Sequence, residues 1–179
     1  YILSKYFKTL VVHASTQSTT HNDGQVLFLK KLGVTRVNLS RELNINEVKS
    51  LTAFAHLHSV STEVFIHGSY CVGFSGLCYL SSALSGNSGN RGRCTQPCRD
   101  QYETTSTGSD FPLNLKDNSA FSDLEALIEA GVDSLKIEGR CKGPAYVYTV
   151  VDCWRKQLER YEEGEHLLDD DPALYKVFN

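Results

Sequence analysis

The chain has 179 residues, of which 41% are hydrophobic, and a formal net charge of −3. This composition allows one buried core and excludes a mainly disordered protein. The small negative charge excludes a general attraction to nucleic acid or anionic membranes, so a polyanion would need a local basic patch. No apolar run approaches the roughly 18 residues that span a bilayer, and the first residues lack the pattern of a signal peptide. Because the sequence contains no methionine, we expect it to be a piece of a longer protein.

Strand-like apolar runs alternate with helix-like amphipathic runs along the chain. The expected strands are Thr9–His13, Arg36–Leu39, Glu63–His67 and Ser134–Glu138. The expected helices cover Gly24–Leu32, the residues after Asn44, the residues after Ser122, and a long stretch that begins at Pro144.

Cap patterns support the predicted ends of these helices. Asn44 with Glu47, and Ser122 with Glu125, match the capping box. The glycines at positions 33 and 131 are suited to the left-handed residue that ends a helix. Proline is favoured at a first helical position, as expected for the long last helix.

Alternating strands and helices indicate a parallel sheet with right-handed crossovers. A (β/α) barrel and a doubly wound sheet both satisfy this pattern. Charged and histidine side chains at the carboxyl ends of the strands favour the barrel, because barrel enzymes hold their active sites there. We therefore predict an α/β protein: residues 1–165 form a partial parallel (β/α) barrel, the C-terminal half of a TIM-type barrel, with a cysteine-rich loop at residues 68–111. The acidic segment at residues 166–179 is predicted to be a linker toward a following domain.

Side-chain alternation identifies candidate catalytic residues near the strand ends. If Val64 and Ile66 pack outward under helices, Glu63 and His67 point inward. The candidates selected by position are His13, Arg41, Glu42, Glu63, His67, Lys136, Glu138 and Arg140. The basic members suit carboxylate or phosphate binding, since arginine binds both in bidentate fashion. The structural alternative is that Arg41 with Glu42, and Lys136 with Glu138, form ion pairs inside a barrel.

Four cysteines follow the strand that ends at His67, with the spacing C-x6-C-x15-C-x3-C: Cys71, Cys78, Cys94 and Cys98. Four soft thiolates without a histidine among them suit an iron–sulfur cluster or a structural zinc. Disulfides or free thiols are the third alternative. Cys141 and Cys153 are expected to lie outside this site.

Hydrolase motifs are weak in this segment. The sequence GFSGL has Leu77 where the nucleophile elbow G-x-S-x-G needs its second glycine, so that motif fails. A cysteine nucleophile with His67 as base is conceivable, but four clustered thiols are explained more economically as ligands.

Three stretches, EVFIHGSYCVGFSGLCYLSS, SGNRGRCTQPCR and AGVDSLKIEGR, closely resemble the collagenase-like peptidase family thirty-two, whose mechanism is unassigned. The earlier VVHASTQSTTHN and VNLSREL are similar as well, so the likeness covers nearly the whole chain. The family includes bacterial iron–sulfur enzymes that hydroxylate a cytidine of ribosomal RNA or a wobble uridine of transfer RNA, and a pair that hydroxylates a ubiquinone precursor. SGNRGRCTQPCR is most similar to the ribosomal RNA type.

The resemblance implies a [4Fe-4S] cluster held by Cys71, Cys78, Cys94 and Cys98, with zinc as the alternative, and prephenate as an oxygen donor. It also implies an RNA substrate and a cytoplasmic protein. The local basic patch, Arg91, Arg93 and Arg99, is the predicted RNA contact. The alternative functions are a peptidase, as the family name suggests, and a metal-binding module without catalysis. The family barrel begins before this chain does, which would place part of the active site outside it.

Overall fold

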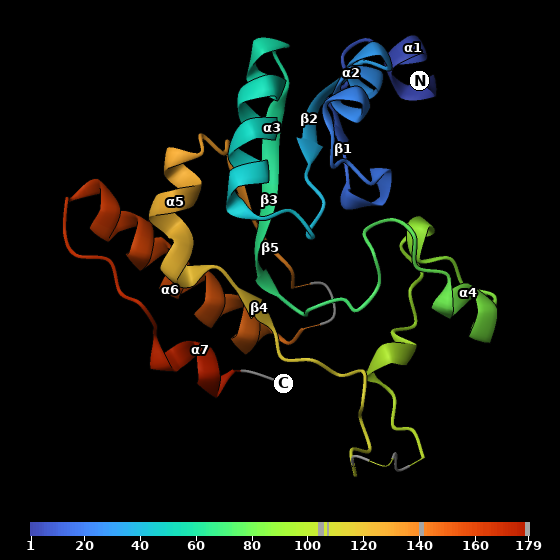
Figure 1. Ribbon diagram of the computed structural model, residues 1–179, viewed down its shortest axis with the longest axis vertical. Coiled ribbons are helices and arrows are strands. Elements are labelled where there is room, and N and C mark those ends of the chain that lie inside the picture. Colours follow the sequence, from blue (N-terminus) through green and yellow to red (C-terminus); the bar gives the residue numbers. More distant parts are fainter. Residues whose placement is uncertain (104–105, 107, 140–141, 178–179) are drawn as a thin grey trace.

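A five-stranded, mostly parallel sheet forms the centre of the computed structural model, which describes residues 1–103, 106, 108–139 and 142–177. The parallel strands are β1 (Val12–Ala14), β2 (Val34–Asn38), β3 (Ser61–Gly68) and β5 (Ser134–Ile137), and they lie in the order β1-β2-β3-β5. The short β4 (Asn118–Ser119) pairs antiparallel with the end of β3. The predicted α/β class with a parallel sheet is confirmed, but the sheet in the described residues is open and does not close into a barrel (Figure 1).

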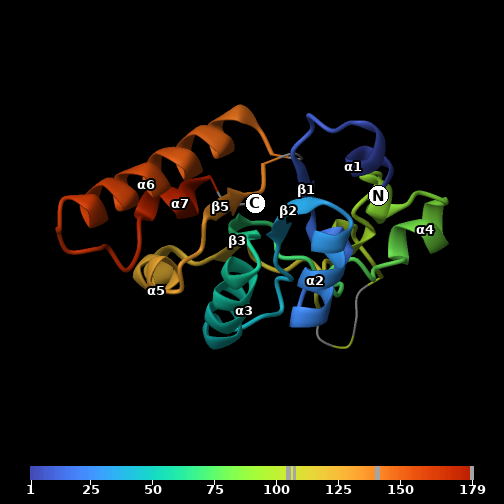
Figure 2. The ribbon, with the colours of Figure 1, turned by 90° about the horizontal axis from the view of Figure 1, so that it is seen from above.

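Seven α-helices lie around this sheet within the described residues: α1 (Ile2–Tyr6), α2 (Asp23–Lys31), α3 (Ile45–Leu57), α4 (Leu80–Ser85), α5 (Leu124–Glu129), α6 (Pro144–Glu162) and α7 (Pro172–Lys176). Figure 2 shows α2, α3 and α5 on the same side of the sheet. The core forms beneath them because Val37, Val64 and Ile66 project to that side and are buried. None of the described helices is long and apolar enough to cross a membrane.

The cap and glycine signals in the sequence correctly predicted several helix ends. The Asn44 side chain accepts hydrogen bonds from the backbone N–H groups at positions 46 and 47, and Glu47 accepts one from the Asn44 N–H, which completes the capping box. Gly33 and Gly131 have positive φ values of 87° and 77°, as expected for residues that end helices. Pro144 occupies the start of α6.

The predicted capping box at Ser122 and Glu125 is wrong. A short 3-10 turn occupies Phe121–Asp123, and α5 begins at Leu124 without a side-chain cap. The buried ring of Phe121, in this turn, packs edge-on against that of Trp154, with an interplanar angle of 77° and 5.4 Å between ring centroids, so tertiary packing holds the turn in place of the predicted cap.

The segment predicted as a linker packs against α6 over its described part. The Gln157 side chain exchanges two hydrogen bonds with the backbone of Leu168, at 2.7 and 3.2 Å. Leu174 of α7 is buried in the core. Residues 166–177 are therefore part of the packed structure, and a following domain stays a prediction.

Candidate metal centre

One cavity of about 600 Å³ contains all four predicted cysteine ligands in its lining. It lies at the carboxyl ends of β3 and β5, where Phe65, Lys136 and Glu138 also face it. Figure 1 shows the cysteine-rich segment leaving the end of β3 and extending past one side of the sheet to α4. The predicted position of the cysteine loop, on the face formed by the strand ends, is therefore confirmed.

The four cysteines of this cavity are all free thiols. A Cβ atom on Gly73 would lie 3.1 Å from the Cys78 Sγ and 3.8 Å from the Cys71 Sγ, so both sulfur atoms flank this glycine. Burial raises the pKa of the Cys98 thiol; Arg99 opposes the effect, and the nearby Cys71 and Cys94 raise the pKa further. Four thiolates in this cavity would repel one another, which makes a bound cation or cationic cluster the natural partner.

Within the described residues, the side chains do not form a ready-made site for a single ion. Among residues 1–103, 106, 108–139 and 142–177, no three side chains of the His, Cys, Asp or Glu types converge closely enough to hold one metal ion. Zinc requires about 2.3 Å to each sulfur, and so needs tightly converging ligands.

Arg41 and Glu42, predicted as catalytic, bind the cysteine loop. The backbone N–H and the Nε of Arg41 each lie 3.3 Å from the Ser75 Oγ, and its Nη2 donates to the Gly73 carbonyl at 3.4 Å. The Glu42 carboxylate accepts a 2.8 Å hydrogen bond from the Ser75 N–H. Ser75 is fully buried between Cys71 and Cys78, so the end of β2 holds this part of the loop in place.

We expect Glu42→Ala to loosen the cysteine loop, because it leaves the buried Ser75 N–H without an acceptor. The free energy of unfolding should fall by about 1–3 kcal/mol. Chymotrypsin should cleave faster at Phe74 than in the wild type. The control is Glu162→Ala, which alters an exposed carboxylate at the end of α6. Equal unfolding energies and cleavage rates for the two variants would contradict this role of Glu42.

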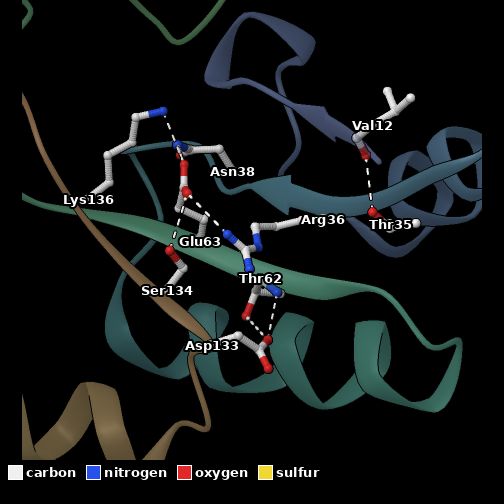
Figure 3. A network of polar contacts seen from close by, with 9 residues as sticks. All are labelled: Val12, Thr35, Arg36, Asn38, Thr62, Glu63, Asp133, Ser134 and Lys136. Carbon is white, nitrogen blue, oxygen red and sulfur yellow. Dashed lines mark hydrogen bonds and ion pairs between the residues drawn. The ribbon is translucent and has the colours of Figure 1, made fainter. Parts of the chain in front are cut away.

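Glu63 is the centre of a polar network on the sheet face opposite the core (Figure 3). Lys136 Nζ lies 3.1 Å from its carboxylate, Asn38 Nδ2 donates at 2.6 Å, and Ser134 Oγ donates at 3.2 Å. Burial acts to raise the pKa of Glu63, but the hydrogen bond and charge of Lys136, with the other donors, outweigh it and lower the pKa. The carboxylate is therefore ionised and fully engaged, and Lys136 pairs with Glu63 instead of Glu138.

His67 departs from the predicted alternation. A register shift after Phe65 sets His67 opposite Ile137, and its ring lies 6.2 Å from that of Tyr146 on α6. The ring is buried, with Nδ1 3.1 Å from the Ser119 Oγ and no described partner for Nε2. Burial lowers the pKa of His67, Asp117 opposes this, and Lys142 adds to it. The imidazole is thus held neutral against α6.

The remaining candidate catalytic residues do not all lie at the cavity. Glu138 lines the large cavity and also a smaller pocket of about 40 Å³ that includes Glu42 and His67. His13 is exposed on β1, opposite Arg36, and does not line either of these two pockets. Arg140 and Cys141 lie outside the described residues. Cys153 is buried on α6, away from the four clustered cysteines.

A buried charged pair, which the sequence does not predict, lies behind His67. Lys142 Nζ lies 3.4 Å from the Asp117 carboxylate, and the two side chains are only 6% and 4% exposed. The Tyr146 hydroxyl donates to the same carboxylate at 2.6 Å, and Lys142 Nζ lies 4.7 Å from the Tyr146 ring centroid. Burial, together with this hydrogen bond, raises the pKa of Tyr146. No spacing or periodicity in the sequence joins these positions.

The three arginines of the basic patch differ in their contacts. Arg99 donates to the Tyr70 carbonyl at 2.6 Å, to the Leu115 carbonyl at 2.7 Å, and to the Asn114 side chain. Arg99 therefore fastens two segments of the loop together, and its contact with RNA stays a prediction. Arg91 and Arg93 are exposed.

Comparison with known families places the chain in one of them. The model of peptidase family U32 matches residues 1–179, so the chain belongs to this family. The predicted family resemblance is confirmed. No solved structure matches the chain significantly.

Named relatives include both RNA-modifying proteins and proteases. The chain is 39% identical over 165 residues to the 23S rRNA 5-hydroxycytidine C2501 synthase of Escherichia coli, covering 88% of this chain and 25% of the relative. It is 37% identical over 162 residues to the tRNA hydroxylation protein P1 of Bacillus subtilis, covering 84% and 38%. It is 35% identical over 188 residues to a collagenase of Porphyromonas gingivalis, covering 94% and 45%. The chain thus spans between a quarter and a half of the length of these relatives.

Proposed function

We propose that this chain is part of an iron–sulfur-dependent enzyme that hydroxylates a base of ribosomal or transfer RNA. The observation that carries the proposal is the cavity at the strand ends that contains all four cysteines. Relatives named for hydroxylation of ribosomal and transfer RNA support the reaction class.

The residues of the cavity fit a [4Fe-4S] cluster. Cys71, Cys78, Cys94 and Cys98 would hold it, and the absence of a Cβ atom at Gly73 leaves room beside two of the sulfur atoms. Four cysteines with no histidine among them suit such a cluster, and zinc stays the alternative. A cluster with four cysteine ligands supplies electron transfer when bound.

This chain's own residues would position the substrate beside the thiols. Phe65 and Lys136 line the cavity, and Lys136 Nζ lies 5.0 Å from the Phe65 ring centroid. The 3.1 Å ion pair with Glu63 holds the Lys136 ammonium group in position. The ammonium group is suited to an anionic or carbonyl oxygen of a substrate, and the ring to a flat base. Prephenate as an oxygen donor rests on the family resemblance alone.

We infer further that the open sheet is part of a (β/α) barrel completed by strands elsewhere in the protein. The parallel strands and the site at their carboxyl ends support this geometry. An RNA-modifying role also implies a cytoplasmic protein.

Nucleoside analysis of cellular RNA tests the proposed function. Deletion of the gene should remove one hydroxylated pyrimidine from ribosomal or transfer RNA, detected by mass spectrometry as the loss of one oxygen atom. The wild-type gene should restore the nucleoside, and a gene with Cys78→Ala should not. Identical nucleoside profiles in the deletion and wild-type strains would contradict the proposal.

A peptidase is the second candidate, because two relatives are named collagenases. A cysteine peptidase needs a thiol paired with a base. His67 Nδ1 contacts the Ser119 hydroxyl instead of a cysteine thiol, so the described geometry gives a peptidase little support. Cleavage of gelatin by the purified protein, abolished by a single cysteine substitution, would favour the peptidase.

A further inference from the structure

The cysteine-rich segment differs in charge from the rest of the molecule. Residues 67–99 contain three arginines and no aspartate or glutamate, whereas the whole chain has a net charge of −3. Arg99 is engaged within the loop. The side chains of Arg91 and Arg93 are exposed and make no hydrogen bond or ion pair with any other residue that the structure describes. These two cations are available to an anionic partner.

The same cysteine-rich segment also contains exposed aromatic rings. Tyr70, Phe74 and Tyr79 are 46%, 47% and 66% exposed, so much of each ring faces solvent. Tyr70 and Phe74 line the same cavity as the four thiols. The ring of Phe74 is supported by His21, whose ring is perpendicular to it with 6.1 Å between the centroids. Exposed rings gathered in one loop are typical of a binding surface.

We propose that these rings and arginines bind an unpaired stretch of RNA, with bases stacked on Tyr70, Phe74 and Tyr79 and phosphates at Arg91 and Arg93. Aromatic rings bind single strands because unstacked bases present their faces, while a duplex keeps its bases stacked inside. The cavity of about 600 Å³ lies in the size range of small-molecule sites, so it can admit one base beside the thiols. This inference rests on the proposed function and narrows its substrate to unpaired RNA.

Binding measurements on the anaerobically purified protein test the proposal. Fluorescence anisotropy is recorded with a labelled single-stranded RNA oligonucleotide and with the same strand in a duplex. Phe74→Ala and Tyr79→Ala should each weaken single-strand binding about tenfold, because each removes one stacking contact, and should change duplex binding much less. Phe74→Trp should retain the affinity. Tyr175→Ala is the control, since it removes an exposed tyrosine on α7, outside the cysteine loop.

Salt dependence tests the arginines separately. Arg91→Ala and Arg93→Ala should each weaken binding and reduce the slope of log affinity against log salt concentration by about one. Unchanged single-strand affinity in Phe74→Ala and Tyr79→Ala, or equal losses for the single strand and the duplex, would overturn the inference. Its failure is distinguishable from failure of the proposed function. If the ring variants bind RNA normally and cellular RNA is still hydroxylated by the wild-type protein, only the RNA-binding inference is contradicted. If gene deletion leaves the nucleoside profile unaltered, the proposed function itself is contradicted.

Discussion

Cys78→Ala should abolish iron binding, and Cys153→Ala should leave it unchanged. The Cys78 sulfur flanks Gly73 together with that of Cys71, and both line the cavity with Cys94 and Cys98. Removal of one of the four proposed ligands would open the site and expose a bound cluster to solvent and oxygen. Cys153 is the matched control, because burial and a hydrogen bond to Asp171 raise the pKa of its thiol to about 11. Cys153 also lies outside the lining of the cavity that contains the other four cysteines.

Iron and sulfide analysis of the two purified variants measures this difference, with circular dichroism to verify that both are folded. The Cys153→Ala protein should contain as much iron as the wild type. A folded Cys78→Ala protein with a full iron content would contradict the assignment of Cys78 as a ligand. Loss of iron from the Cys153→Ala protein alone would place the metal elsewhere in the chain.

The second large effect concerns the buried pair behind His67: Asp117→Asn should lower the free energy of unfolding by about 3–5 kcal/mol. The substitution leaves the Lys142 ammonium buried without its counter-charge, and such uncompensated charges are strongly destabilising. Tyr146 would keep a hydrogen-bond acceptor at position 117, so the loss would report mainly the missing charge.

Asp152→Asn provides the control for this prediction. It breaks the exposed ion pair between Lys156 and Asp152 on α6, in which the two side chains are 64% and 39% exposed. Exposed pairs contribute only about 0–1 kcal/mol. Urea unfolding at neutral pH compares the two variants. Losses of similar, small size would show that the buried Asp117–Lys142 pair does not stabilise the fold more than an exposed pair does.

Features that depend on neighbouring residues were predictable from the sequence. The cap of α3 at Asn44 and the ends of α2 and α5 at Gly33 and Gly131 follow from backbone chemistry within a few positions. Alternation along β3 and β5 correctly placed Glu63 and Lys136 on one face, where they form an ion pair. The four cysteines could be identified because their side-chain type and clustering are informative before the fold is known.

Features that depend on distant packing were not predictable. Arg41 and Glu42 lie at a strand end, as catalytic residues often do, but they contact Gly73 and Ser75 more than 30 positions away. Arg99 also has its partners far along the chain. The start of α5 depends on how Phe121 packs against Trp154, which overrides the local cap signal. In each case the sequence showed the correct chemical group but not its partner.

Absorption spectroscopy with iron, sulfide and zinc analysis, on protein purified without oxygen, tests the central claim most directly. The cysteine cavity predicts a broad visible charge-transfer absorption, about four iron and about four sulfide per chain, and little zinc. Stoichiometric zinc, or no metal under these conditions, would contradict an iron–sulfur enzyme and leave a structural zinc site or a peptidase as the alternatives to test.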